Sequence, residues 1–123
     1  MALEYFGEEQ IRDLVTRLTR VTITGQLQWA QNDNSDFSFV TSLPTSIITL
    51  TSRDRDDLAP HILAVFTHEP KLLQEIDSSH LNAPLADDIA DLYLLIKRKT
   101  LKLDAVARQI LDDLDKLGNE PPF

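Results

Sequence analysis

Apolar residues recur at helical spacing near the start of the chain. Over residues 6–20, Ile11, Leu14, Val15 and Leu18 fall on one face of a helix. Acidic residues stand at the beginning of this segment and arginines at its end, an order that complements the helix dipole. The pattern therefore predicts an N-terminal helix over residues 6–20.

The chain then changes to β-branched and alternating residues. Residues 21–24 are all β-branched, which favours extended backbone, and an Asn- and Asp-rich turn at residues 32–36 joins two alternating segments as in a β-hairpin. The segment around Val65 is apolar on both faces, which predicts a central strand or one covered by helices. Residues 72–77 fit a strand or a short helix, and we favour the strand. The predicted strands are residues 25–30, 37–41, 46–51, 61–67 and 72–77.

Two further helical patterns follow the strands. The first begins at Pro84 or Leu85 and ends near residues 97–99, where three basic residues complement the helix dipole. The second runs from about residue 103 or 104 to Leu117, and Gly118 ends it. Its apolar stripe comprises Val106, Ile110, Leu114 and Leu117, with Leu103 and Leu111 beside it.

This order of elements predicts a single α+β domain over residues 1–123. One helix is followed by an antiparallel meander of four or five strands and then by two helices, because short connections join consecutive strands in antiparallel order. The apolar face of such a sheet must be covered, and we expect the amphipathic helices to cover it. The edges of the sheet are templates for pairing with another chain.

Composition narrows the chemistry that this domain can perform. The 123 residues include no Cys, three Gly, and 12 Lys+Arg against 20 Asp+Glu, for a net charge of −8. The lack of Cys removes disulfides, thiolate metal sites and thiol nucleophiles, and it fits a reducing cytoplasm. Scarce glycine excludes a glycine-rich phosphate loop. We expect neither nucleic acid nor membrane as a partner, because the chain is acidic and has no membrane-spanning apolar run.

Polar candidates for catalysis or metal binding have simpler explanations. Asp87 and Asp91 lie one helical turn apart and suit a shared Mg²⁺, but negative charge near a helix start also explains them. His61, His68 and His80 show no metal-ligand spacing, and we interpret them as residues of surface loops. We therefore predict no catalytic residue, no metal site and no bound cofactor.

A charged connection and a set of aromatic residues remain as candidates for a binding surface. Arginine binds carboxylates and phosphates through two hydrogen bonds, which suits a recognition loop, but we favour the interpretation of residues 53–57 as a self-neutralising solvated loop. The aromatic residues suit an interface, the lining of a ligand cleft, or simply the core. The candidate interaction or ligand surface is Trp29, Phe37, Phe39, Arg53, Arg55 and Tyr93.

Three stretches of sequence carry a resemblance to other proteins. They are residues 25–29 (GQLQW), 54–57 (DRDD) and 92–97 (LYLLIK). With these stretches the whole chain resembles small uncharacterised bacterial α+β proteins that have a helix, an antiparallel meander and two closing helices. The resemblance implies a companion or regulatory module rather than a catalyst, and it transfers no functional residue.

We therefore expect a non-enzymatic cytoplasmic protein-interaction or regulatory module. Its partner is another protein or a second copy of itself, as in a homodimer. One alternative is a small-molecule-binding sensory domain with a cavity lined by Trp29, Phe39, Phe66 and Tyr93. A second alternative is a carboxylate- or metal-dependent enzyme, which requires ionisable groups that converge in one cleft with perturbed pKa values.

Overall fold

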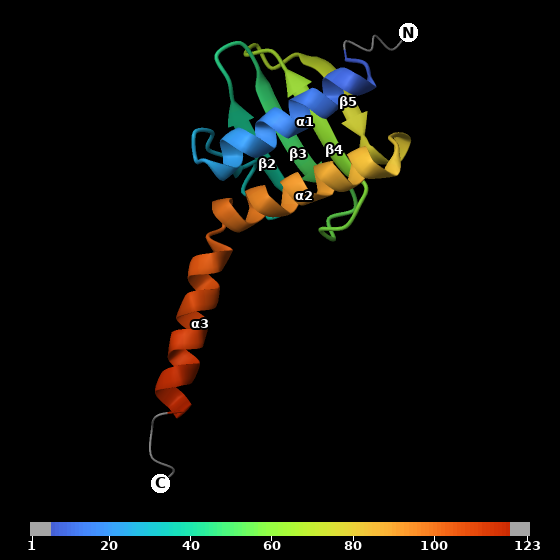
Figure 1. Cartoon of the computed structure of the whole chain (residues 1–123). Coiled ribbons are helices and arrows are strands. Elements are labelled where there is room, and N and C mark those ends of the chain that lie inside the picture. The colour runs from blue at the N-terminus through green and yellow to red at the C-terminus, as the bar shows by residue number, and fades with distance from the viewer. Residues whose placement is uncertain (1–5, 119–123) are drawn as a thin grey trace.

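A computed structural model of the chain describes residues 6–118 (Figure 1). It confirms an α+β fold with an N-terminal helix, a five-stranded antiparallel sheet and two C-terminal helices. The helices are α1 (Glu8–Ile23), α2 (Ala83–Thr100) and α3 (Leu103–Gly118), and a 3₁₀ turn (Ser78–His80) precedes α2. The strands are β1 (Ala30–Gln31), β2 (Ser38–Ser42), β3 (Ile47–Ser52), β4 (His61–Phe66) and β5 (Leu72–Asp77).

The five strands form a meander, since their order in the sheet is their order in the sequence. The register places four buried apolar residues in one row across the sheet: Phe39, Leu50, Leu63 and Ile76. Helices α1 and α2 lie across this face (Figure 1) and contribute their own apolar stripes to a single core. The helical part of the core comprises Ile11, Val15, Leu18, Leu85, Ile89, Leu92, Tyr93 and Ile96.

The opposite face of the sheet is left open by α1 and α2. Side chains alternate between faces along a strand, so Ile62 and Phe66 point away from the core that Leu63 and Val65 enter. Both Ile62 and Phe66 are only half-buried. Strand β4 is therefore central, as predicted, but helices cover only one of its faces.

Helix α1 extends further than the sequence predicts. The sheet with α1 and α2 forms the body of the protein. Thr22 follows Leu18 by one helical turn and is buried in this body, and its hydroxyl accepts a hydrogen bond from Trp29 Nε1 at 3.0 Å. This packing outweighs the preference of β-branched residues for extended backbone. The prediction of extended structure at residues 21–24 was therefore wrong, because residues 21–23 are helical and Thr24 ends the helix with helical backbone angles, a φ of −75° and a ψ of −10°.

The first strand is much shorter than predicted. Gly25 adopts a φ of 78°, and the Leu27 amide donates to the Val21 carbonyl at 3.0 Å, so a turn occupies most of residues 25–30. Only Ala30 and Gln31 pair with β2. The alternation of Leu27 and Trp29 arises here from a loop that packs on the core, not from a strand.

Polar side chains join the beginnings of α1 and α2. The Asn82 side chain accepts the amide hydrogen of Leu85 at 3.0 Å and thereby caps α2. The same side chain donates to the carboxylate of Glu8, in the first turn of α1. Asn82 therefore fixes where α2 begins and places it beside α1.

Helix α3 projects away from the body (Figure 1). Helix α2 ends at Thr100 with Leu101 as its C-cap, and Lys102 turns the chain with a left-handed φ of 55°. No residue of α3 is buried. The expectation that all the amphipathic helices cover the sheet was therefore wrong for α3. No helix within residues 6–118 combines the length and the hydrophobicity needed to cross a membrane.

Candidate functional site

Helix α3 carries a continuous apolar stripe that no other described part of the chain covers. Six large apolar side chains on it remain 39% to 64% exposed, in contrast to the nearly complete burial of the apolar stripes of α1 and α2. They are Leu103, Val106, Ile110, Leu111, Leu114 and Leu117. Large contiguous apolar patches are rare on monomeric soluble proteins and mark binding sites when they occur.

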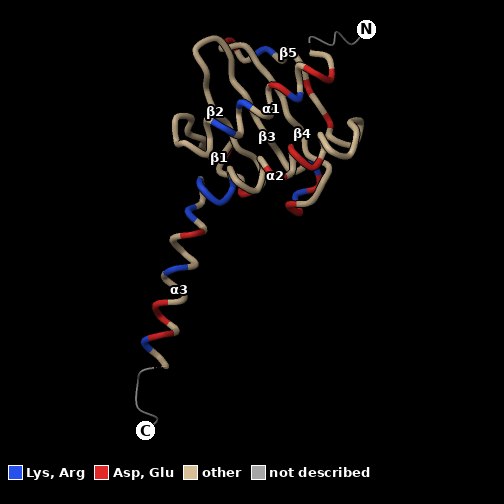
Figure 2. Tube along the Cα trace, viewed as in Figure 1, with Lys and Arg blue, Asp and Glu red and all other residues tan. Residues whose placement is uncertain are grey.

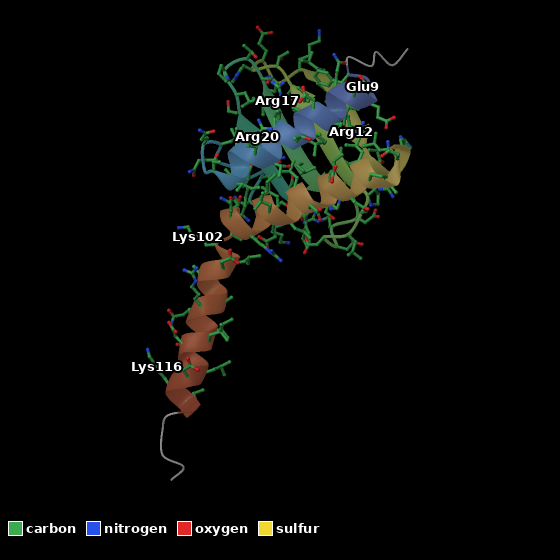
Figure 3. The ribbon with its side chains drawn as sticks, in the orientation of Figure 1. Glu9, Arg12, Arg17, Arg20, Lys102 and Lys116 are labelled. Atoms are coloured by element: carbon green, nitrogen blue, oxygen red, sulfur yellow. The ribbon has the colours of Figure 1, made fainter. Side chains whose placement is uncertain are left out.

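Charged residues of both signs surround this stripe. Figure 2 shows acidic and basic positions alternating along α3, and a basic group where α2 passes into α3. Lys102 marks the near end of α3 and Lys116 the far end, while Arg12, Arg17 and Arg20 lie along α1 in the body (Figure 3). An apolar stripe bordered by mixed charge suits contact with protein better than with an anionic membrane or nucleic acid.

A second surface feature lies between the beginning of α1 and strand β5. It is an open groove of about 520 Å³ whose lining includes Phe6, Ile11, Leu73, Ile76 and Leu81. Carboxylates of Glu8, Glu75 and Asp77 stand at the same groove. Its lining mixes apolar and acidic residues with Gly7, Gln74 and His80, and none of the residues of the predicted interaction or ligand surface belongs to it.

The connection between β3 and β4 is held down by one carboxylate. Asp57 Oδ1 accepts hydrogen bonds from the Tyr93 hydroxyl at 2.7 Å and from Lys97 Nζ at 2.6 Å. Tyr93 and Lys97 lie one turn apart on α2, so both face the loop. Lys97 Nζ also lies 4.6 Å from the centre of the Phe37 ring, a cation–π distance. One residue of the loop is thus tied to two residues of α2.

Ionisation of Asp57 is favoured by these contacts. Burial acts against the charged form, but the hydrogen bonds from Lys97 and Tyr93 and the positive charge of Lys97 outweigh it and lower the pKa of Asp57. Burial raises the pKa of the Tyr93 hydroxyl, and its bond to Asp57 raises it further. Asp57 is therefore a carboxylate and Tyr93 a neutral phenol at physiological pH.

Ser52, at the end of β3, organises the same loop from inside. Its buried hydroxyl accepts hydrogen bonds from the backbone amides of Asp56 and Asp57 at 3.3 and 3.1 Å. Arg55 and Asp57 take left-handed backbone conformations, with φ of 58° and 67°. The loop therefore has a defined shape, which its dense charge alone did not predict.

His61 lies beneath this loop and is only 1% exposed. Its ring stacks at a tilt on Tyr93, with 4.6 Å between ring centres, and neither ring nitrogen has a hydrogen-bond partner within the described residues. Burial is the largest influence and lowers the pKa of His61, and the opposing effects of the Asp57 backbone and the Asp56 and Asp57 carboxylates do not offset it. The prediction that His61 belongs to a surface loop was wrong, whereas His68 and His80 are exposed.

Acidification is expected to destabilise the protein through His61. The pKa of His61 is lower in the folded chain than its ordinary value of about 6.5, so the unfolded chain binds this proton first and stability falls as the pH drops below about 6.5. One such group changes the free energy of unfolding by at most about 1.4 kcal/mol per pH unit. Urea unfolding between pH 8 and pH 5 measures this slope.

Two histidine variants make this pH test specific. His61→Phe should flatten the slope above pH 5, whereas His68→Asn, at an exposed histidine, should leave it unchanged. A wild-type stability that is level from pH 8 to pH 5 would contradict the assignment.

Of the six residues of the predicted interaction or ligand surface, four lie together in the structure and two lie apart. The four are Phe37, Phe39, Arg55 and Tyr93. Phe39 and Tyr93 are fully buried and meet edge to face at 5.8 Å, so they belong to the core and not to a surface. Phe37 is half-buried near them, with the Arg55 guanidinium 5.7 Å from its ring centre.

The remaining two predicted residues lie apart from this group. Arg53 is exposed and pairs with Asp77 at 3.1 Å and with Asp54 at 3.5 Å. Trp29 is half-buried beside the end of α1. The proposed aromatic lining of a cavity is likewise divided, because Phe66 lies on the opposite face of the sheet from Phe39.

Sequence reasoning missed Asp57 and Lys97 as partners. Asp57 lies in one charged run of the sequence and Lys97 in another. Nothing in either run indicates a contact between two residues that are 40 positions apart. The six residues of the α3 stripe were noted but were expected to pack on the sheet.

The described residues also bear on the metal hypothesis. Between residues 6 and 118, His, Asp and Glu side chains do not gather in groups of three or more that suit a metal ion. Asp87 and Asp91 are both exposed on α2. The ionisable side chains that do converge, at Asp57, hold a loop in place.

Comparison with known proteins gives no family for this chain. No protein-family model matches it, and neither the curated proteins nor the solved structures contain a significant match. The functional argument therefore rests on the geometry above.

Proposed function

We propose that this protein is a non-enzymatic protein-interaction or regulatory module, and that α3 is its contact element. The observation that carries the proposal is the row of six large apolar side chains on a helix that leaves the body and buries no residue. Complete burial of a fully exposed side chain of this type contributes about 1.5–3 kcal/mol of favourable free energy. Covering the row therefore contributes substantially to the free energy of binding a partner.

The body of the protein can serve as the support that carries this contact helix. Its core is complete without α3, since α1 and α2 already cover the inner face of the sheet. Asp57, His61 and Tyr93, three ionisable groups with shifted pKa values, are engaged in or beneath a fixed loop. We expect the module to act in the cytoplasm on another protein or on a second copy of itself, and not on nucleic acid or membrane.

Ile110→Asp is expected to abolish partner binding and leave the body folded. It places a charge in the middle of the stripe, where a partner would have to bury it without compensation. The matched control is Ala105→Asp, which adds the same charge at an exposed position on the opposite side of α3. The measurement is affinity purification of the full-length tagged protein from its host, with quantitative mass spectrometry of what co-purifies.

We expect Ile110→Asp to reduce the specific partner, an untagged copy included, at least tenfold relative to both the wild type and Ala105→Asp. At a protein concentration low enough to keep all three proteins monomeric, thermal unfolding should show the same midpoint for each, because the substituted residues lie outside the core. Equal recovery of every partner by Ile110→Asp would refute α3 as the contact element.

A further inference from the structure

The apolar residues of α3 follow the repeat of a coiled coil. Leu103, Ala107, Ile110, Leu114 and Leu117 are separated by four, three, four and three residues. This spacing is that of the a and d positions of a heptad, with Ala107 and Leu114 at a and the other three at d. We call these five residues the seam. A seam of this kind packs against another helix with the same repeat, because the side chains of each helix fit into the spaces between the side chains of the other.

A second copy of this chain supplies such a helix. We propose, as a specific form of the function proposed above, that the protein self-associates by pairing α3 side by side with α3 of a second copy in parallel orientation. The stripes of α1 and α2 are already used in the core, whereas α3 offers its full length. A symmetric pair buries the same stripe on both copies, which is the commonest form of homo-oligomer.

Residues that flank the seam decide the orientation. Val106 occupies a g position and Leu111 the e position five residues later, and these two positions meet across a parallel pair. Both side chains are exposed, so a parallel pair extends the apolar contact on each side. An antiparallel pair instead matches g with g and e with e, which sets Val106 beside Asp113 and Leu111 beside Asp104. Apolar and charged neighbours are thereby mismatched only in the antiparallel arrangement.

The small size of the contact predicts weak self-association. Helix α3 has 16 residues and is about 24 Å long. A stable interface of standard size takes about 20–30 residues from each partner. The α3 pair is below that size, so the dimer should dissociate on dilution instead of being permanent.

Sedimentation equilibrium over a range of concentrations tests the self-association. The wild type and Ala105→Asp should pass from monomer to dimer as concentration rises, and Ile110→Asp should remain monomeric. A wild-type chain that is monomeric up to millimolar concentration would overturn the proposal. If Ile110→Asp still lost a different protein in the purification from the host, the α3 contact function would stand and only the self-pairing would fall.

The lack of Cys makes orientation directly measurable. Leu103→Cys and Leu117→Cys each place one thiol at an end of the seam, and Ala105→Cys places one on the outer side of α3 as a control. Under mild oxidation two thiols form a disulfide, and the added oxidant takes up the two electrons and two protons released. In a parallel pair each seam variant lies opposite its own copy, so both should cross-link at least tenfold faster than the control.

Mixing the two seam variants distinguishes an antiparallel pair from a parallel pair. In an antiparallel pair, like cysteines lie about 20 Å apart at opposite ends, and only a mixture of Leu103→Cys with Leu117→Cys cross-links. That result would overturn the parallel arrangement. Cross-linking of both seam variants no faster than Ala105→Cys would overturn the pairing of α3 altogether.

Discussion

Replacing Phe39 by Ala is expected to lower the free energy of unfolding by about 3–5 kcal/mol. The Phe39 side chain is fully buried in the central row of the sheet and meets Tyr93 edge to face at 5.8 Å. Its removal leaves a cavity between the sheet and α2 and also removes the aromatic contact. Because small domains are stable by only about 5–15 kcal/mol, a large share of the total is lost. Equilibrium unfolding in urea measures the loss.

Phe37→Ala is the matched control, two residues earlier in the same chain segment. Phe37 is half-buried and contacts Lys97 and Arg55 through its ring face, so its loss should cost only about 1 kcal/mol. Equal losses from the two variants would contradict the placement of Phe39 in the core.

Asp57→Ala is expected to lower the free energy of unfolding by about 2 kcal/mol. The substitution leaves the buried Tyr93 hydroxyl without its acceptor and the largely buried Lys97 ammonium without its counter-charge. The value is below that of a fully buried ion pair because the Asp57 side chain is 37% exposed and water screens it. Urea unfolding at pH 7, where Asp57 is ionised, measures the effect.

Two further variants test the cause of that loss. Asp54→Ala removes an exposed carboxylate from the same loop and should change stability by no more than about 0.5 kcal/mol. Adding Lys97→Met to Asp57→Ala should recover part of the loss, because the uncompensated ammonium is gone. Strict additivity of the two single changes would argue against a coupled Asp57–Lys97 pair.

The fold was predictable from the sequence to the extent that burial follows local periodicity. Strand β5 has the predicted bounds, and α2 and α3 begin and end close to where their stripes do. The end of α1 was not predictable, because the burial of Thr22 against Trp29 depends on a loop that folds back. The shortness of β1 has the same origin, since alternation does not distinguish a strand from a loop that packs on the core.

The candidate site was less predictable, for two physical reasons. The pairing of Asp57 with Lys97 joins residues 40 apart in sequence, and only the approach of the loop to α2 creates it. The burial of His61 likewise follows from the loop above it and not from its own strand. For α3 the sequence revealed the apolar stripe, but a stripe does not state whether the surface that it meets belongs to the same chain.

The exposure of α3 has a consequence for sequence variation. Substitutions in the core, such as those at Phe39 or Leu63, are limited by folding, because every change there opens a cavity or forces a clash. Folding of the body imposes no such limit on Ile110 or Leu114, whose side chains it does not bury. If related chains keep apolar residues at these two positions, selection for binding explains it. Apolar residues kept in α1 and α2 are explained by selection for folding instead.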